Sequence, residues 1–356
     1  MSRKSIIEPI QGLRCLAFLG IFIEHCGINA LGCWGVSVFF VMSGFLNGIK
    51  KSDQNVYSLR IVEKIGGVFR KMKKLYPLHI VTLVLSIVVY YIVLNSRVVR
   101  NVFLFIIQFV ANIGLFQSLI PRSDCYFAFN SVSWYLSTYV FILIIFSFFE
   151  PFLARKRSNK KLLIIAAILI FIEIVISTIL LFVGDNISTI VSDDIVKWIT
   201  YISPFYRFFD YSIAFIMGRI FINKSTSILS VKQICFLQMF AFALIPFLQI
   251  IYYNGVNNSI MDPFRYSLLF LPDAIILVLA CAFDKGPISD FLSNKMFLFI
   301  GKISGYAFLI HQLVIVFFKE LGALLVIPST VIYLVSFVIT IIISHMYFKI
   351  INGGTE

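Results

Sequence analysis

The chain has 356 residues, of which 60% are hydrophobic and only 13% are charged. A soluble domain is about half apolar and about a quarter charged, so this composition excludes an ordinary soluble fold. The net charge of +13 comes largely from Lys and Arg in short segments between apolar runs, which indicates orientation in a membrane and not nucleic-acid binding.

Eleven apolar runs are candidate transmembrane helices, because about 20 helical residues cross a hydrocarbon core of about 30 Å. In chain order they cover residues 10–29, 34–49, 75–95, 100–120, 134–153, 162–184, 205–223, 233–253, 263–283, 300–319 and 324–348. We therefore expect an all-α, polytopic membrane bundle that forms a single domain over residues 1–356.

The fourth run, 100–120, is expected to re-enter the membrane or lie at its interface. If all eleven runs crossed, the basic segments 50–74 and 154–161 would lie on opposite sides, against the positive-inside rule. Polar residues also interrupt this run, namely Gln108, Asn112, Gly114 and Gln117. About ten transmembrane helices remain, with both termini in the cytoplasm and about four times as many Lys and Arg inside as outside.

Arg14 and His25 stand out in the first run, because ionisable residues within a membrane are costly. Eleven helical residues return to within about 20° of the same face and rise about 16 Å. Arginine suits a phosphate or carboxylate, and histidine suits general-base catalysis, although structural pairing in the bundle explains the spacing equally well. Glu24 points about 100° away from His25 and is expected to face a separate partner.

Five further segments, taken with Arg14 and His25, resemble the acyltransferase-3 family of membrane acyltransferases. They are the small-residue run Gly32–Phe45, the basic stretch that ends at Pro77, the Trp-x-Leu-Ser element Trp134–Ser137, and the segments Pro204–Asp210 and Gly301–His311. They occur in the family's order and cover almost the whole chain. The small residues Gly35, Ser43 and Gly44 are also expected to allow close helix packing.

The resemblance implies an O-acyltransferase that takes an acyl group from cytoplasmic acyl-CoA, most simply acetyl-CoA. The implied acceptor is a hydroxyl of a cell-envelope glycan, such as lipopolysaccharide O-antigen, capsule or exopolysaccharide. It further implies a stand-alone enzyme of the bacterial inner membrane, without a hydrolase-like outer domain, bound cofactor or metal. The family's catalytic Arg–His pair maps to Arg14 and His25.

The remaining candidate site residues fall into two groups. Donor binding is expected of Arg70, Lys73, Lys74, Arg207, Trp134 and Ser137. A cavity is expected to contain Ser43, Tyr206, Asp210 and His311. Alternatives stay open: the basic stretch suits anionic lipid, Arg207 and Asp210 can pair on one helix, and His311 can cap a neighbouring group. The sequence departs from the family at Lys71 and Lys74, where Arg is frequent, and at Tyr139, where Glu is frequent.

Two other functions explain a basic, polytopic chain. A flippase or transporter for a lipid-linked or free glycan would also place charged residues in spans, but the sequence shows no internal repeat of the kind transporters have. An envelope-glycan polymerase would be expected to show a large outer loop rich in arginine or acidic residues, whereas segment 96–133 holds three arginines. The acceptor sugar, the acyl length and the oligomeric state are not determined by the sequence.

Overall fold

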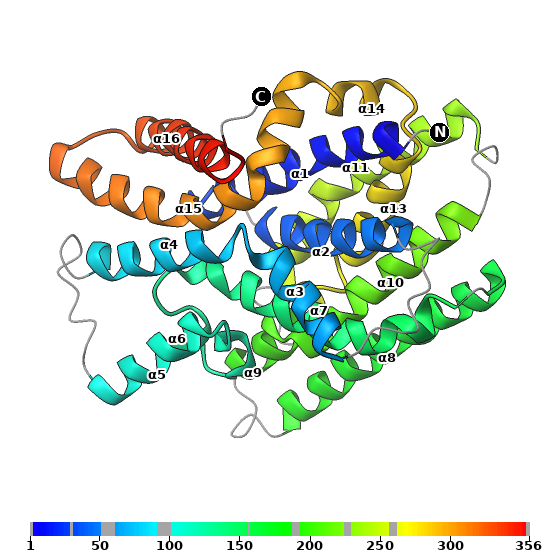
Figure 1. Cartoon of the computed structure of the whole chain (residues 1–356), viewed down its shortest axis with the longest axis horizontal. Coiled ribbons are helices and arrows are strands. Elements are labelled where there is room, and N and C mark those ends of the chain that lie inside the picture. Colours follow the sequence, from blue (N-terminus) through cyan, green and yellow to red (C-terminus); the bar gives the residue numbers. More distant parts are fainter. Residues whose placement is uncertain are drawn as a thin grey trace.

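The computed structural model describes residues 3–28, 31–50, 61–90, 101–155, 157–186, 193–223, 229–255 and 262–353. Within these ranges the chain is helical and contains no β-strand, as the composition predicts (Figure 1). Each of the eleven predicted runs overlaps at least one helix, whereas the helix Ile61–Met72 was not among the predicted runs. Apolar length therefore located most of the longer helices.

The longer helices are α1 (Arg3–His25), α2 (Leu31–Lys50), α3 (Ile61–Met72), α4 (Tyr76–Val88), α5 (Val102–Ile113), α7 (Trp134–Leu153), α8 (Asn159–Asn186), α10 (Pro204–Asn223), α11 (Val231–Gly255), α13 (Leu271–Ala282), α15 (Lys295–Leu325) and α16 (Ser329–Ile351). Shorter helices connect them: η3 (Gln117–Leu119), α6 (Ser123–Tyr126), η4 (Ser131–Ser133), α9 (Asp193–Lys197), η5 (Trp198–Ile202), α12 (Asp262–Arg265) and α14 (Pro287–Leu292).

Six helical segments in the described ranges are long and apolar enough to cross a membrane, which makes the chain a multi-pass membrane protein. They are α2, η4 with α7, α8, α11, α15 and α16. The helices α4, α5 and α13 are apolar but shorter, and α1 and α10 carry ionisable residues along their length. The expected count of ten crossings and the cytoplasmic location of both termini stay predictions.

The run 100–120 forms a short helix followed by a reversal of the chain. The twelve residues of α5 rise about 18 Å, less than the thickness of a hydrocarbon core. Leu115 then adopts a left-handed conformation with φ of 57°. The end of α5 lies beside the start of α4, because Tyr76 donates to the Ile113 carbonyl and the His79 ring contacts the Asn112 carbonyl. This geometry fits a segment that re-enters or lies at the interface.

The run 263–283 differs from expectation, because its regular helix begins only at Leu271. Polar contacts explain the irregular start. Arg207 donates to the backbone oxygen of Tyr266 and to the Ser267 hydroxyl, so these two residues are held in a turn against α10. Pro272 then occupies the first turn of α13, where its missing N–H costs nothing.

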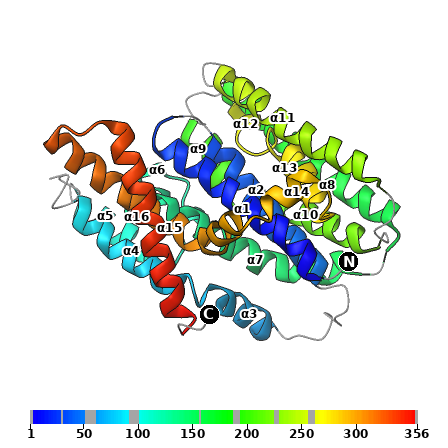
Figure 2. The ribbon, with the colours of Figure 1, turned by 90° about the horizontal axis from the view of Figure 1, so that it is seen from above.

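Close backbone contacts hold the centre of the bundle, where α1 and α2 lie between α15 and α16 on one side and α8, α10 and α11 on the other (Figure 2). A Cβ atom on Gly44 of α2 would lie 2.2 Å from the Tyr211 oxygen of α10, and one on Gly301 of α15 would lie 1.9 Å from the Gln11 oxygen of α1. Only glycine fits at these crossings, which confirms the packing role predicted for Gly44.

Candidate active site

Arg14 opens into a cavity of about 400 Å³, named here the Arg14 cavity. Helices α1, α2, α3, α7, α10 and α15 contribute to its wall. The polar and aromatic residues that line it are Arg14, Phe39, Ser43, Asn47, Lys50, Lys71, Tyr135, Tyr139, Tyr211, Ser304 and Phe308. None of the lining residues in the described ranges is acidic, so the cavity is electropositive and suits an anionic ligand.

The basic stretch contributes one residue to this cavity, and it is not one of the three predicted. Arg70, Lys73 and Lys74 are exposed and do not line it; Lys74 instead donates to Asn352 over 2.5 Å. Lys71 takes the place expected of them, and Lys50 at the end of α2 joins it. A signal for Lys71 exists in the sequence: it flanks the apolar stripe of α3 formed by the buried residues Val68 and Met72.

His25, eleven residues after Arg14 on α1, opens into a second cavity of about 320 Å³, named here the His25 cavity. Aromatic rings and charges of both signs surround it. Its lining includes Glu24, His25, Cys33, Phe127, Trp134, Lys197, Tyr201, Tyr252, Arg265, Tyr266 and Phe308. The rise along α1 thus places Arg14 and His25 in separate cavities, although both lie on one face of the helix.

Hydrogen bonds determine the proton positions on His25 and its neighbour. His25 Nδ1 lies 2.9 Å from the Ile21 carbonyl oxygen, which only accepts, so Nδ1 carries the hydrogen of the neutral ring. By the same reasoning His311 Nδ1, 2.7 Å from the Phe308 oxygen, carries its hydrogen. His311 Nε2 is then unprotonated and lies 3.4 Å from His25 Nδ1, as a second and weaker acceptor for the hydrogen that Nδ1 donates to Ile21. This arrangement leaves His25 Nε2 unprotonated and able to accept a proton.

His311 therefore supports His25 and does not line either cavity. Its side chain is fully buried, and the two imidazole rings pack edge to face with centroids 4.9 Å apart. Lys319 on the same helix donates to the backbone oxygen of His25 over 3.3 Å. Both contacts come from α15, and they hold the end of α1 that carries His25.

Glu24 has the separate partner that its position on the helix predicts. Its Oε2 atom accepts from the backbone N–H of Gly32 over 2.5 Å. This N–H belongs to the first turn of α2, where helical donors have no partner within the helix. Glu24 thus caps α2 and joins the ends of the first two helices beside the cavity.

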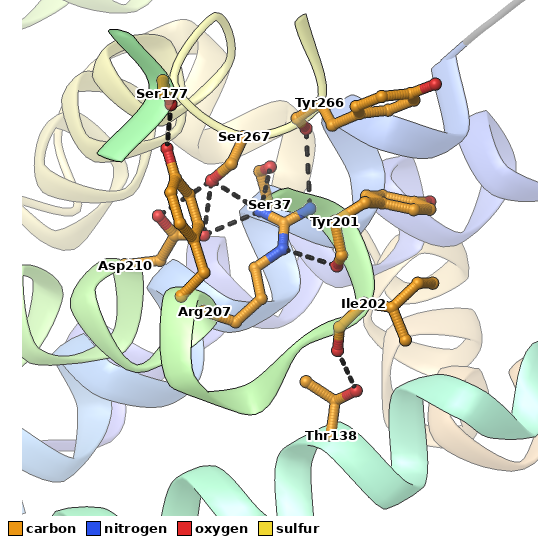
Figure 3. Close-up of polar contacts among 10 residues, drawn as sticks. Ser37, Thr138, Ser177, Tyr201, Ile202, Arg207, Asp210, Tyr266 and Ser267 are labelled. Carbon is orange, nitrogen blue, oxygen red and sulfur yellow. Dashed lines mark hydrogen bonds and ion pairs between the residues drawn. The ribbon is translucent and has the colours of Figure 1, made fainter. Parts of the chain in front are cut away.

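Arg207 and Asp210 form a buried network that lines neither cavity (Figure 3). Both side chains are fully buried, and Arg207 Nη1 lies 2.7 Å from Asp210 Oδ2. Ser267 accepts from Arg207 and donates to Asp210. The geometry favours the structural pair over the predicted role in donor binding, because every nitrogen of the guanidinium already donates within the protein.

The Arg207 network nevertheless shapes the His25 cavity. Arg207 donates to the backbone oxygens of Tyr201 and Tyr266 over 2.9 and 3.5 Å, and the rings of these tyrosines line the cavity. Figure 3 shows both rings on the same side of the guanidinium. The network therefore holds the backbone of two residues whose rings form part of the cavity wall.

The other predicted residues are dispersed. Ser43 lines the Arg14 cavity as expected, whereas Trp134 lies in the His25 cavity and not with the donor residues. Ser137 is fully buried and donates to the Leu115 oxygen over 2.6 Å, which holds the turn after α5. Tyr206 contacts Ser177 of α8 over 2.9 Å, outside both cavities.

A layer of aromatic rings separates the two cavities. Phe308 of α15 lines both of them. Its ring centroid lies 5.2 Å from that of Tyr135 and 6.3 Å from that of Phe39, and 5.8 Å from that of His311. Phe308 and its aromatic neighbours therefore lie where the two cavities adjoin.

These features define a multi-pass helical membrane protein in which one helix bears a cationic residue and a basic residue in two adjoining compartments. The family model described as an acyltransferase domain matches residues 7–347. The chain therefore belongs to the acyltransferase-3 family and is a membrane acyltransferase. No curated protein and no solved structure matches the chain.

Proposed function

We propose that this protein is an O-acetyltransferase of the bacterial inner membrane, which moves an acetyl group from cytoplasmic acetyl-CoA to a hydroxyl of a cell-envelope glycan. The candidate acceptors are lipopolysaccharide O-antigen, capsule and exopolysaccharide. The observation that carries this proposal is the placement of Arg14 and His25, on one face of α1, in two cavities that meet at Phe308.

The Arg14 cavity is the donor site in this proposal. Acetyl-CoA is a substrate with several phosphate groups, and the cavity offers Arg14, Lys50 and Lys71 without an acidic residue among its described lining. Guanidinium and ammonium groups bind phosphate through short, charge-assisted hydrogen bonds. The flexible arm of the donor would extend past Phe308 and bring the thioester towards His25.

The His25 cavity is the acceptor site. The rings of Tyr201, Tyr252 and Tyr266 offer flat apolar faces together with hydroxyl groups, which suits a sugar with one apolar face and a polar rim. Lys197 and Arg265 add positive charge to the same wall. No bound cofactor takes part, since the thioester of the donor is already activated.

His25 is the general base of the proposed reaction. Its Nε2 accepts the proton of the acceptor hydroxyl while the oxygen attacks the thioester carbonyl. The new C–O bond forms, the C–S bond breaks, and the proton on His25 passes to the departing thiolate to give free CoA. In the alternative covalent route, Nε2 itself attacks the thioester and the acetyl group then passes from His25 to the hydroxyl.

The experiment that tests the proposal measures transfer of radiolabel from acetyl-CoA in inverted membrane vesicles. We expect His25→Gln to lower the transfer rate by about 10²- to 10⁴-fold, because general-base catalysis typically contributes that much. His345→Gln is the matched control, because His345 lies on α16 outside both cavities and packs against Phe299.

Two results bear on the alternatives. Full activity of a correctly inserted His25→Gln protein would contradict the proposal. If wild type transfers no label while cells lacking the protein export less glycan, the transporter interpretation replaces it. Label that remains on the wild-type protein after acid quench, and is absent from His25→Gln, would select the covalent route.

A further inference from the structure

A long apolar groove lies on the outer face of α7, α8 and α10, outside both cavities. Its volume is about 770 Å³, and almost all of its wall is aliphatic or aromatic. Residues that line it include Phe149, Phe152, Ile165, Ile168, Ile176 and Phe208. The groove is open along its outer edge, where about half of the Phe149 and Ile168 side chains is exposed.

The length of the groove matches one leaflet of a bilayer. On α8 it extends from Ile165 to Ile176, eleven residues that rise about 16 Å. Half of a hydrocarbon core of about 30 Å has the same length. An acyl chain that runs parallel to the helices would therefore fill the groove from the membrane surface to the midplane.

Three basic residues flank one end of the groove, although none of them belongs to its wall. The Arg157 guanidinium lies 4.3 Å from the ring centroid of Phe152, which lines the groove. Lys161 precedes Ile165 by one turn of α8 and is exposed on the same face. Arg219 of α10 is only 8% exposed and donates to the Ala154 oxygen through Nη2.

Arg219 is the clearest indication that this end of the groove can bind an anion. Its Nη1 atom has no hydrogen-bond partner among the described residues, although the side chain is more than nine-tenths buried. An unsatisfied buried guanidinium nitrogen is costly. Asn223 donates to Asn159 over 3.2 Å and fastens α10 to α8 here.

We propose that the groove binds one anionic phospholipid, with an acyl chain against α8 and the phosphate between Arg157, Lys161 and Arg219. The basic segment 154–161 faces the cytoplasm by the charge bias of the sequence, and anionic lipids attract basic residues on that side. The groove shares none of its wall with the Arg14 and His25 cavities. This proposal therefore does not depend on the proposed reaction.

Native mass spectrometry of the purified full chain, titrated with phosphatidylglycerol or with phosphatidylcholine, tests it. We expect wild type to bind one phosphatidylglycerol in preference to phosphatidylcholine. The triple variant Arg157→Gln, Lys161→Gln, Arg219→Gln should bind phosphatidylglycerol about 100-fold more weakly, since each basic residue contributes about a factor of five. The matched control replaces the exposed residues Lys232, Lys295 and Lys349 by Gln and leaves the groove intact.

A second variant keeps the test decisive if the triple variant does not fold. Leu169→Trp fills the groove and retains all three cations, and it should also weaken phosphatidylglycerol binding. Unchanged binding in a folded triple variant or in Leu169→Trp overturns the proposal. Preferential binding of a polyprenyl phosphate over phosphatidylglycerol also overturns it, because the occupant would then be a glycan carrier lipid.

Discussion

The Arg14 cavity and the His25 cavity share one helix and one aromatic residue, yet their chemistry differs. The first collects Arg14, Lys50 and Lys71 without an acidic side chain in its described lining, whereas the second combines Glu24, two cations and several tyrosines. The first suits a polyanion, and the second suits a polar ring together with a proton acceptor. A single amphipathic stripe on α1 can therefore serve two substrates of different kinds.

The largest effect that would sharpen this comparison is expected at Arg14. Arg14→Gln should lower kcat/KM for acetyl-CoA by about 100-fold, because a charge-assisted hydrogen-bond pair is worth about 3 kcal/mol. Arg14→Lys should recover part of the loss, since it keeps the charge but not the planar fork. Steady-state kinetics with Arg122→Gln as control measure this; Arg122 is an exposed arginine outside both cavities. An effect on the acceptor KM alone would reverse the assignment of the two sites.

A smaller effect is expected at His311, which acts on the reaction through His25. His311→Leu removes the imidazole that packs edge to face on His25 and the weaker of the two acceptors near its Nδ1. It should lower kcat about tenfold with both KM values unchanged, as loss of an orienting partner does. His311→Gln offers an amide oxygen in its place and should restore part of the rate. A purely structural role would instead lower the amount of folded protein equally in both variants and leave kcat unchanged.

The aromatic layer between the cavities gives a third test. Phe308→Ala should join the two compartments, admit water to the thioester and raise acetyl-CoA hydrolysis in the absence of acceptor several-fold. Loss of a buried phenylalanine also costs about 3–5 kcal/mol of stability. Phe146→Ala, at a buried ring that lines neither cavity, controls for that loss. Equal hydrolysis by the two variants would show that Phe308 does not separate the compartments.

The smallest effect is expected at the edge of the donor site. Lys50 is exposed at the end of α2, so Lys50→Gln should raise the KM for acetyl-CoA only about twofold, as exposed ion pairs contribute about 0.5 kcal/mol. The difference from wild type should vanish at high salt because exposed charges are screened. A salt-independent increase would place Lys50 in direct, desolvated contact with the donor.

The sequence was most informative where one helix carries the pattern. The spacing of Arg14 and His25 depends only on the rise and turn of α1, so it predicted that the two residues lie on one stripe and at different depths. The family motifs extended this to the whole chain. The apolar runs located the longer helices other than α3, because burial of an uninterrupted backbone in lipid requires helices.

Residues whose role depends on contacts with other helices were predicted less well. Arg70, Lys73 and Lys74 have the charge expected of a donor site, but the orientation of α3 turns Lys71 towards the cavity instead. Arg207 and Ser137 have all the chemistry of binding residues, and the fold uses both to hold backbone segments in place. Nothing in a local pattern distinguishes a guanidinium that binds a ligand from one that binds its own chain.

The sequence by itself determined the all-helical membrane class, the positions of most of the longer helices, the family, and the spacing of Arg14 and His25 along one helix. Only the tertiary structure decided that His311 packs against His25, that Phe308 lines both cavities, and that Arg207 holds the backbone of Tyr201 and Tyr266. The physical reason is how far apart along the chain the interacting residues lie. Helix formation and hydropathy depend on neighbours along the chain, whereas a cavity and its hydrogen bonds depend on residues brought together by packing from distant helices.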